Sequence, residues 1–376
     1  MQRNYTIDLI KCFCMYLVVW FHAAPADAYI GGINGIYFHY VILLFPRFVV
    51  SYFFVVSGFL LGVKILNKQG QTLYVKRYLM KIIKLFVTWY LFYFIYDLIK
   101  CMLLSHLKGL DVGHEVTSFI YSQAKLLPIY YGYGQTSYQL WYLTALIWSI
   151  LILSLFIKVN KIGLLLGIGF CLNVIGLFGQ TYSGIFRLPI NTNDALFYGL
   201  FYTTLGCFIA YHYEGLLRRI EKIKTSTFVI FFIIFSILGV GEAMITIGPL
   251  NGYSSGSNYN LSTLPLTLIL FCVAIKNKQY GRQTIFTKIG AQAVGIYITH
   301  VLFLSIMTNL FILFNIESLQ SYIAFHLFIS VVIFITSYYF YSLLQVFKKV
   351  LSGYFYSIVS FLKKPIRERS YGRSKL

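Results

Sequence analysis

Charged side chains are scarce in this sequence. Only 11% of its 376 residues are Asp, Glu, Lys or Arg, whereas 59% are hydrophobic and 19% are aromatic. A soluble domain of this length carries far more charge, so the composition excludes a soluble fold. The aromatic content suits a protein of the bilayer, in which Tyr and Trp gather at the two interfaces.

The sequence also lacks a metal-binding or disulfide pattern. Its six cysteines lie in or beside apolar segments, and Cys12 and Cys14, two residues apart on an expected helix, point to different sides. We therefore expect buried small side chains, no disulfide framework and no metal site. No internal repeat is found. The first apolar run has no small-residue cleavage site, so we expect it to belong to the mature protein.

Apolar runs long enough to cross a bilayer predict an all-α, polytopic membrane protein with about ten transmembrane helices. We interpret residues 1–350 as one membrane-embedded domain and residues 351–376 as a basic cytoplasmic tail, disordered against anionic lipid. The longest outer loops are expected at 105–137 and 248–260. The expected spans are 6–23, 40–63, 82–104, 138–157, 162–180, 195–212, 226–247, 261–275, 289–313 and 322–346.

The formal net charge of +20 is distributed unevenly between the two expected sides of the membrane. With the N-terminus in the cytoplasm, 26 of the 31 Lys and Arg residues fall on the cytoplasmic side. This asymmetry is typical of membrane proteins and predicts that both termini are cytoplasmic. Because the charge follows topology, we expect no nucleic-acid partner. The basic residues expected outside are Arg47, Lys100, Lys108, Lys125 and Arg187.

The first apolar run, "IDLIKCFCMYLVVWFH" (7–22), carries Asp8, Lys11 and His22. Lys11 and His22 are eleven residues apart, about 1100° around a helix, so they share one face about 16 Å apart. Asp8 lies three residues before Lys11 and is expected to pair with it. Two interpretations of Asp8, Lys11 and His22 stay open. They lie either at the two membrane interfaces, where Lys can snorkel, or in a polar stripe that faces a protein interior or a water-filled cleft.

The same segment resembles the first helix of the acyltransferase-3 family of membrane acyltransferases, which carries Arg or Lys, ten residues, and then His. The family also commonly has Arg-x-x-Arg and a Pro at its third helix, where the nearest basic set of this chain is Arg77, Lys81 and Lys84 and there is no Pro. Lys11 stands where Arg is commoner, which removes a bidentate grip on phosphate. Further segments that resemble the family are "YFFVVSGFLLG" (52–62), "YVKRYLMKIIKLFVTWYL" (74–91), "QLWYLTALI" (139–147) and "GIYITHVLFL" (295–304).

The resemblance implies transfer of an acyl group, usually acetyl, from cytoplasmic acyl-coenzyme A to a sugar hydroxyl. The acceptor is expected to be a cell-surface polysaccharide or its lipid-linked precursor, and the protein to lie in the cell membrane of a bacterium. Acetyl-coenzyme A is then the donor substrate and membrane lipids surround the protein. A homo-oligomer and a separate acyl-accepting protein stay open as partners.

Site residues follow from the resemblance and from depth in the membrane. His22 is expected to act as general base or as acyl carrier, and Glu242 is the candidate carboxylate at a similar depth. An interfacial position explains Glu242 almost as well. Lys11, Arg77 and Lys81 are expected to hold the donor phosphates, with positive-inside topology as the alternative for the loop residues.

Four more residues are candidates for lining the site. Gln139 and Trp141 are expected to contact the acceptor. His300 either lines the site or is a packed core histidine, and Ser57 either acts chemically or, with Gly58, lets two helices approach closely. The competing function is a transporter of a glycan or small solute. It is disfavoured because the sequence shows no paired halves.

Overall fold

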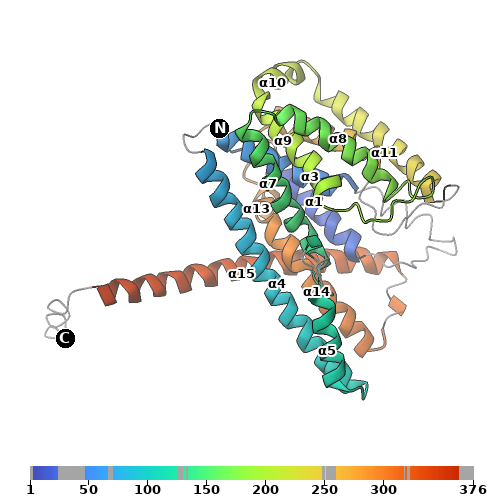
Figure 1. Ribbon diagram of the computed structural model, residues 1–376, viewed down its shortest axis with the longest axis vertical. Coiled ribbons are helices and arrows are strands. Elements are labelled where there is room, and N and C mark those ends of the chain that lie inside the picture. Colours follow the sequence, from blue (N-terminus) through green and yellow to red (C-terminus); the bar gives the residue numbers. More distant parts are fainter. Residues whose placement is uncertain are drawn as a thin grey trace.

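The computed structural model describes residues 3–23, 47–66, 71–124, 130–132, 134–247, 250, 260–316, 318–319 and 322–363. These parts of the chain are mainly helical, and the helices form one bundle (Figure 1). The α-helices are α1 (Tyr5–Ala23), α3 (Phe48–Leu66), α4 (Gln71–Leu107), α5 (Val112–Gln123), α7 (Trp141–Lys158), α8 (Ile162–Phe178), α9 (Leu200–Tyr211), α10 (Tyr213–Glu221), α11 (Thr225–Ile247), α12 (Thr263–Lys276), α13 (Ile285–Ala291), α14 (Ala293–Leu313) and α15 (Ile323–Lys363). A 3₁₀-helix, η2 (Tyr138–Leu140), and a π-helix, η3 (Ala195–Gly199), precede α7 and α9.

Each of the ten apolar runs contains a described helix. Seven of the described helices are long and apolar enough to cross a bilayer, namely those at Tyr5–Ala23, Phe48–Leu66, Thr72–Leu107, Tyr138–Lys158, Thr225–Thr246, Ala293–Leu313 and Ala324–Ser352. Three others are apolar but shorter: Ile162–Phe178, Ala195–Tyr211 and Thr263–Lys276. The all-helical membrane fold is thus confirmed, whereas ten complete spans and cytoplasmic termini stay predictions.

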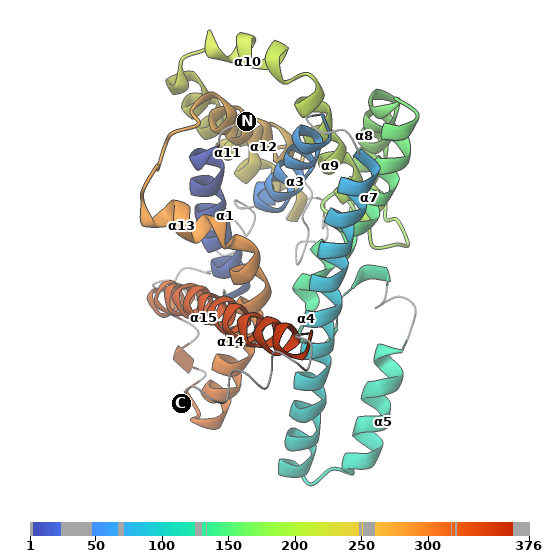
Figure 2. The same ribbon diagram turned by 90° about the vertical axis from the view of Figure 1, so that its left-hand side faces the viewer.

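The outer loop expected at 105–137 contains a helix instead. α4 has 37 residues, about 56 Å of helix, which exceeds the roughly 30 Å of a hydrocarbon core. The chain then turns and α5 runs alongside the end of α4 (Figure 2). The carboxylate of Asp111 accepts hydrogen bonds from the backbone N–H groups of Gly113 and His114 and so starts α5. Most of the second expected loop, 248–260, lies outside the described residues.

The start of the expected tail is also helical. α15 continues as one helix to Lys363, thirteen residues into the segment expected to be disordered. Residues 364–376 lie outside the described part of the chain. The cysteines are all free; Cys12, Cys14 and Cys207 are buried, but Cys171 is exposed on α8, contrary to expectation.

Two packing relationships position the site. α3 and α9 pack in close contact because Gly58 and Gly206 leave room for the partner backbone, at Thr203 and Val55 respectively. α1 lies among α3, α12, α13, α14 and α15. The N-terminal half of α1 packs against α13 at Gly290. A Cβ atom on Gly290 would collide with the Asp8 carbonyl group, so a glycine is required there. Five helices therefore flank α1, the helix with the polar stripe, although its Phe13 is exposed.

Candidate active site

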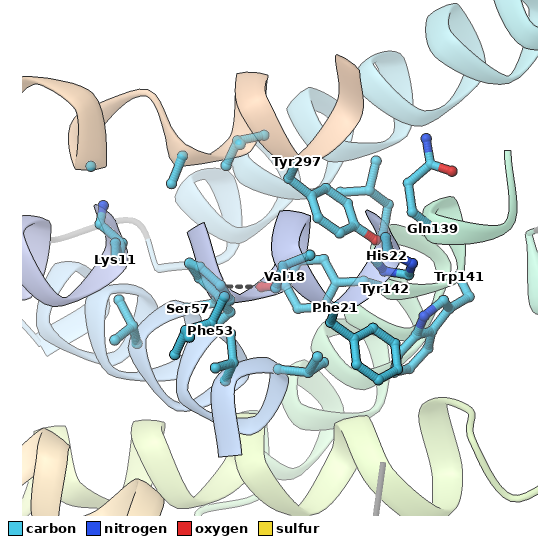
Figure 3. A pocket seen from close by; sticks show the side chains of 18 of the residues that line it. Lys11, Val18, Phe21, His22, Phe53, Ser57, Gln139, Trp141, Tyr142 and Tyr297 are labelled. Carbon is cyan, nitrogen blue, oxygen red and sulfur yellow. Dashed lines mark hydrogen bonds between the residues drawn. The ribbon is translucent and has the colours of Figure 1, made fainter. Parts of the chain in front are cut away.

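A cavity of about 480 Å³ runs along the inner face of α1. Lys11 lines one end of it and His22 lines the other (Figure 3). They are eleven positions apart on the helix, or roughly 16 Å along the axis. The structure therefore places both side chains on one face, as the spacing predicts, and that face borders a protein interior.

The middle of the cavity is mainly apolar, with one polar pair. Val18 of α1 and Phe53 and Val56 of α3 line it. The hydroxyls of Ser57 and Tyr142 are 3.1 Å apart and bridge α3 and α7 there (Figure 3). Ser57 thus faces the cavity.

His22 meets a second histidine at its end of the cavity. The ring centroids of His22 and His300 are 5.3 Å apart with planes at 48°, and the Tyr138 ring is 5.1 Å from His22 on another side. Neither nitrogen of His22 makes a hydrogen bond to the described residues. The sequence predicted both histidines as site residues, and the structure brings their rings into contact.

His300 is fully buried on α14, with 0% of its surface exposed. Its Nδ1 is 3.1 Å from the carbonyl oxygen of Ile296. Its Nε2 has no hydrogen-bond partner among the described residues. Buried polar atoms without partners are rare in folded proteins, so this nitrogen requires an explanation.

Two neighbouring polar groups share this property. Gln139 donates from Nε2 to the Ile298 carbonyl oxygen at 3.2 Å, but its Oε1 is buried and unpartnered within the described chain. The Tyr297 hydroxyl is also buried without a described partner, and in Figure 3 it points toward His22. Both residues line the cavity, as does Trp141. Within the described residues, this end of the cavity therefore presents two unsatisfied polar atoms, those of Gln139 and Tyr297, and the unpartnered Nε2 belongs to His300, which contacts His22 but does not line the cavity.

Arg47 is a cavity residue that the sequence reasoning missed. It directly precedes α3, is 4% exposed, and places its Cζ 5.0 Å from the centroid of the Phe21 ring. From the sequence, Arg47 is expected only to be one of the basic residues on the outer side. The signal was present, because Arg47 lies within the apolar run 40–63 and a cation inside such a run is costly and commonly functional. Tyr297 and Tyr142 carried no comparable signal among 33 tyrosines.

The Lys11 end of the cavity contains the predicted ion pair. Lys11 Nζ is 2.8 Å from Asp8 Oδ1, which confirms the expected pairing. Arg3 binds the other oxygen of Asp8 at 2.9 Å. Arg77 and Lys81 are exposed on the first turns of α4 and do not line the cavity, although Tyr78 between them does. Their role in donor binding stays a prediction.

Glu242 does not meet His22. Its carboxylate accepts hydrogen bonds from the Tyr182 hydroxyl at 2.9 Å and from the backbone N–H groups of Leu261 and Ser262 at 2.5 and 3.1 Å. It is not among the residues that line the cavity. The structure therefore corrects the sequence interpretation, because this carboxylate joins α11 to the start of α12.

Two further carboxylates are likewise engaged elsewhere. Asp97 accepts hydrogen bonds from the backbone N–H and hydroxyl of Thr136. Asp194, just before η3, accepts from Tyr130 and from the Phe197 N–H, and burial raises its pKa. Across the described ranges, no three His, Cys, Asp or Glu side chains gather where they could hold a metal ion.

The profile of the acyltransferase-3 family, described as an acyltransferase domain, matches residues 4–342. The chain belongs to the acyltransferase-3 family. The match contains every residue that lines the cavity, from Lys11 to Tyr297. No curated protein and no solved structure matches the chain significantly. Family membership supports acyl transfer in a membrane and leaves the donor, the acceptor and the residue roles to be proposed.

Proposed function

We propose that this protein transfers an acyl group, most simply acetyl, from cytoplasmic acyl-coenzyme A to a hydroxyl of a cell-surface polysaccharide or its lipid-linked precursor. One observation carries the proposal. A single cavity has a cationic residue, Lys11, at one end and a histidine, His22, at the other. That arrangement suits a long thioester whose anionic and reactive ends must lie far apart.

The donor enters from the Lys11 end. Its phosphates lie near Lys11 and the exposed Arg77 and Lys81 of α4, where cations favour them. The thin pantetheine arm follows the apolar walls and meets the Ser57 and Tyr142 hydroxyls on its way. The roughly 16 Å between Lys11 and His22 matches the reach that this arm needs.

His22 supplies the acid–base chemistry. The acceptor oxygen attacks the thioester carbonyl carbon while His22 takes the hydroxyl proton. The tetrahedral intermediate then expels the coenzyme A thiolate, which receives from His22 the proton that came from the acceptor hydroxyl. The products are the O-acyl ester and the free coenzyme A thiol. A covalent acyl-histidine intermediate is the second route that this geometry serves.

The charge that develops on the carbonyl oxygen needs a donor. The Tyr297 hydroxyl is buried, has no partner within the described residues and points toward His22 (Figure 3). A preorganised donor of this kind contributes strongly because it makes its bond only as the oxyanion forms. Tyr297 is therefore the proposed oxyanion donor.

The acceptor occupies the His22 end of the cavity. Gln139 offers its unpartnered Oε1 to a sugar hydroxyl, and Trp141 offers an indole ring against the sugar. Asn191 and Asn193 line the same cavity from the segment before η3. These groups are the hydrogen-bonding and stacking contacts that a glycan requires.

Sidedness tests the proposal. The acceptor is the surface polysaccharide of the producing cells after mild alkaline removal of its O-acyl groups. Sealed inside-out membrane vesicles that enclose this polymer should transfer label from external acetyl-coenzyme A, and His22→Ala vesicles with equal protein content should not. Right-side-out vesicles should not use external donor. Export of the polymer without consumption of thioester would replace this proposal with transport.

A further inference from the structure

Among the described residues that line the cavity there is no carboxylate of the kind that usually orients a catalytic histidine such as His22. The carboxylates of Glu242, Asp97 and Asp194 are bound to other groups. The ring that meets His22 from α14 is instead that of His300, at 5.3 Å between centroids. We infer that His300 is the positioning residue for His22, a role that rests on the proposed function of His22 as the base.

The hydrogen-bond partner of Nδ1 sets the tautomer of His300. The Ile296 carbonyl oxygen can only accept, so Nδ1 carries the hydrogen. In the neutral ring, Nε2 is then a bare lone pair. A doubly protonated ring would bury a second N–H with no acceptor among the described residues, which is the less favourable state.

This lone pair needs a donor, and the ring of His22, whose centroid is 5.3 Å from that of His300, can supply one. Nε2 lies at the edge of the ring farthest from its own backbone, and it is buried without a described partner. The nearby Gln139 amide donates one of its two N–H groups to the Ile298 carbonyl oxygen. His22 has two ring nitrogens with no hydrogen bond to the described residues. An N–H of His22 directed at His300 therefore satisfies Nε2 of His300 and one of the two nitrogens of His22.

The contact has a chemical consequence. When one nitrogen of His22 donates to His300 Nε2, the opposite nitrogen must carry the lone pair that takes the acceptor proton. The His22 proton shared with His300 stays on His22 throughout, so His300 orients the ring and exchanges no proton. In this structure the two rings touch without a hydrogen bond. Such bonds often tighten only in the substrate complex.

Substitutions that differ in one acceptor atom test the inference. His300→Gln keeps an oxygen near the position of Nε2, whereas His300→Leu and His300→Asn do not reach that position with an acceptor. Vesicle kinetics with acetyl-coenzyme A and the de-O-acylated polysaccharide give kcat and KM for each. We expect Leu and Asn to lower kcat by about tenfold or more, with KM for the donor little changed, and Gln to retain several times more activity than either.

Tyr93→Phe is the matched control for packing. It removes a 2.6 Å hydrogen bond to the Ile298 carbonyl on the same helix and should leave kcat near normal. Equal kcat for Gln, Asn and Leu at equal protein content would overturn the inference, as would normal kcat in His300→Asn. If Leu fails to accumulate, the comparison of Gln with Asn decides. The His22→Ala variant distinguishes failure of the His300 inference from failure of the proposed function. An active His22→Ala enzyme would remove the proposed role of His22 as the base as well.

Discussion

Gly58 of α3 lies so close to Thr203 of α9 that a Cβ atom would collide with the Thr203 carbonyl group. Its neighbour Ser57, about 100° further around the helix, lines the cavity and contacts the Tyr142 hydroxyl at 3.1 Å. From the sequence, the Ser57-Gly58 pair could serve either chemistry or helix packing. In the structure Gly58 serves the packing and Ser57 lines the cavity.

Gly58→Ala is expected to destabilise the protein, whereas Ser57→Ala is not. The added methyl forces α3 and α9 apart, at a cost of about 1–3 kcal/mol for overpacking. Thermal unfolding of the purified proteins in detergent, followed by fluorescence, should show a lower Tm for Gly58→Ala alone. A Tm equal to that of the wild type would mean that the helices can separate at no cost.

Tyr297→Phe should lower kcat by about 10²–10³-fold, because removal of one oxyanion donor costs roughly 2.7–4 kcal/mol of transition-state stabilisation. The ring and its 5.5 Å contact with Tyr142 are retained, so KM should change little. Steady-state kinetics in vesicles measure both constants. Tyr142→Phe, which removes the bond to Ser57, serves as the control and should act mainly on KM for the donor. Normal kcat in Tyr297→Phe would assign the oxyanion to another group.

Arg77→Ala should raise KM for acetyl-coenzyme A more than KM for the acceptor. A phosphate contact far from the reacting atoms contributes to binding and little to the chemical step. Lys84→Ala, seven residues along the same exposed helix, is the control for a general loss of positive charge. If the two variants change KM for the donor equally, Arg77 has no specific phosphate contact.

Glu242→Gln should reduce stability and spare the chemistry. The amide keeps one acceptor oxygen but loses the charge-assisted bonds to Tyr182, Leu261 and Ser262, which costs about 1–3 kcal/mol. A lower Tm together with a normal kcat at permissive temperature is the expected result. A large fall in kcat with unchanged Tm would restore Glu242 as a catalytic carboxylate.

The features that the sequence predicted well depend on local periodicity. Each expected span contains a helix because continuous apolar runs favour helices in a bilayer. The shared face of Lys11 and His22 follows from helix geometry alone. The sequence does not predict α5 because its twelve residues are too few and too mixed in polarity to form an apolar run, and the helix depends on packing against α4 and on the Asp111 cap.

Contacts between distant helices could not be predicted in the same way. His22 and Glu242 were matched by depth, which leaves the angle around the bundle undetermined. His300 meets His22 because α14 packs beside α1, and Glu242 faces α12 instead. Arg47 likewise reaches the cavity only because α3 begins beside Phe21. Such relationships depend on side-chain packing over long sequence separations.

The cavity also bears on the ion gradients of the cell. An energised membrane tolerates no open path for protons or sodium ions, yet an enzyme that connects a cytoplasmic donor to an outer acceptor needs a continuous internal space. The middle of this cavity is lined by the apolar side chains of Val18, Phe53 and Val56. A narrow apolar passage opposes the entry of ions because it cannot replace their hydration shells. The walls proposed to hold the pantetheine arm thus also give the protein a barrier against ion leakage while the cavity is empty.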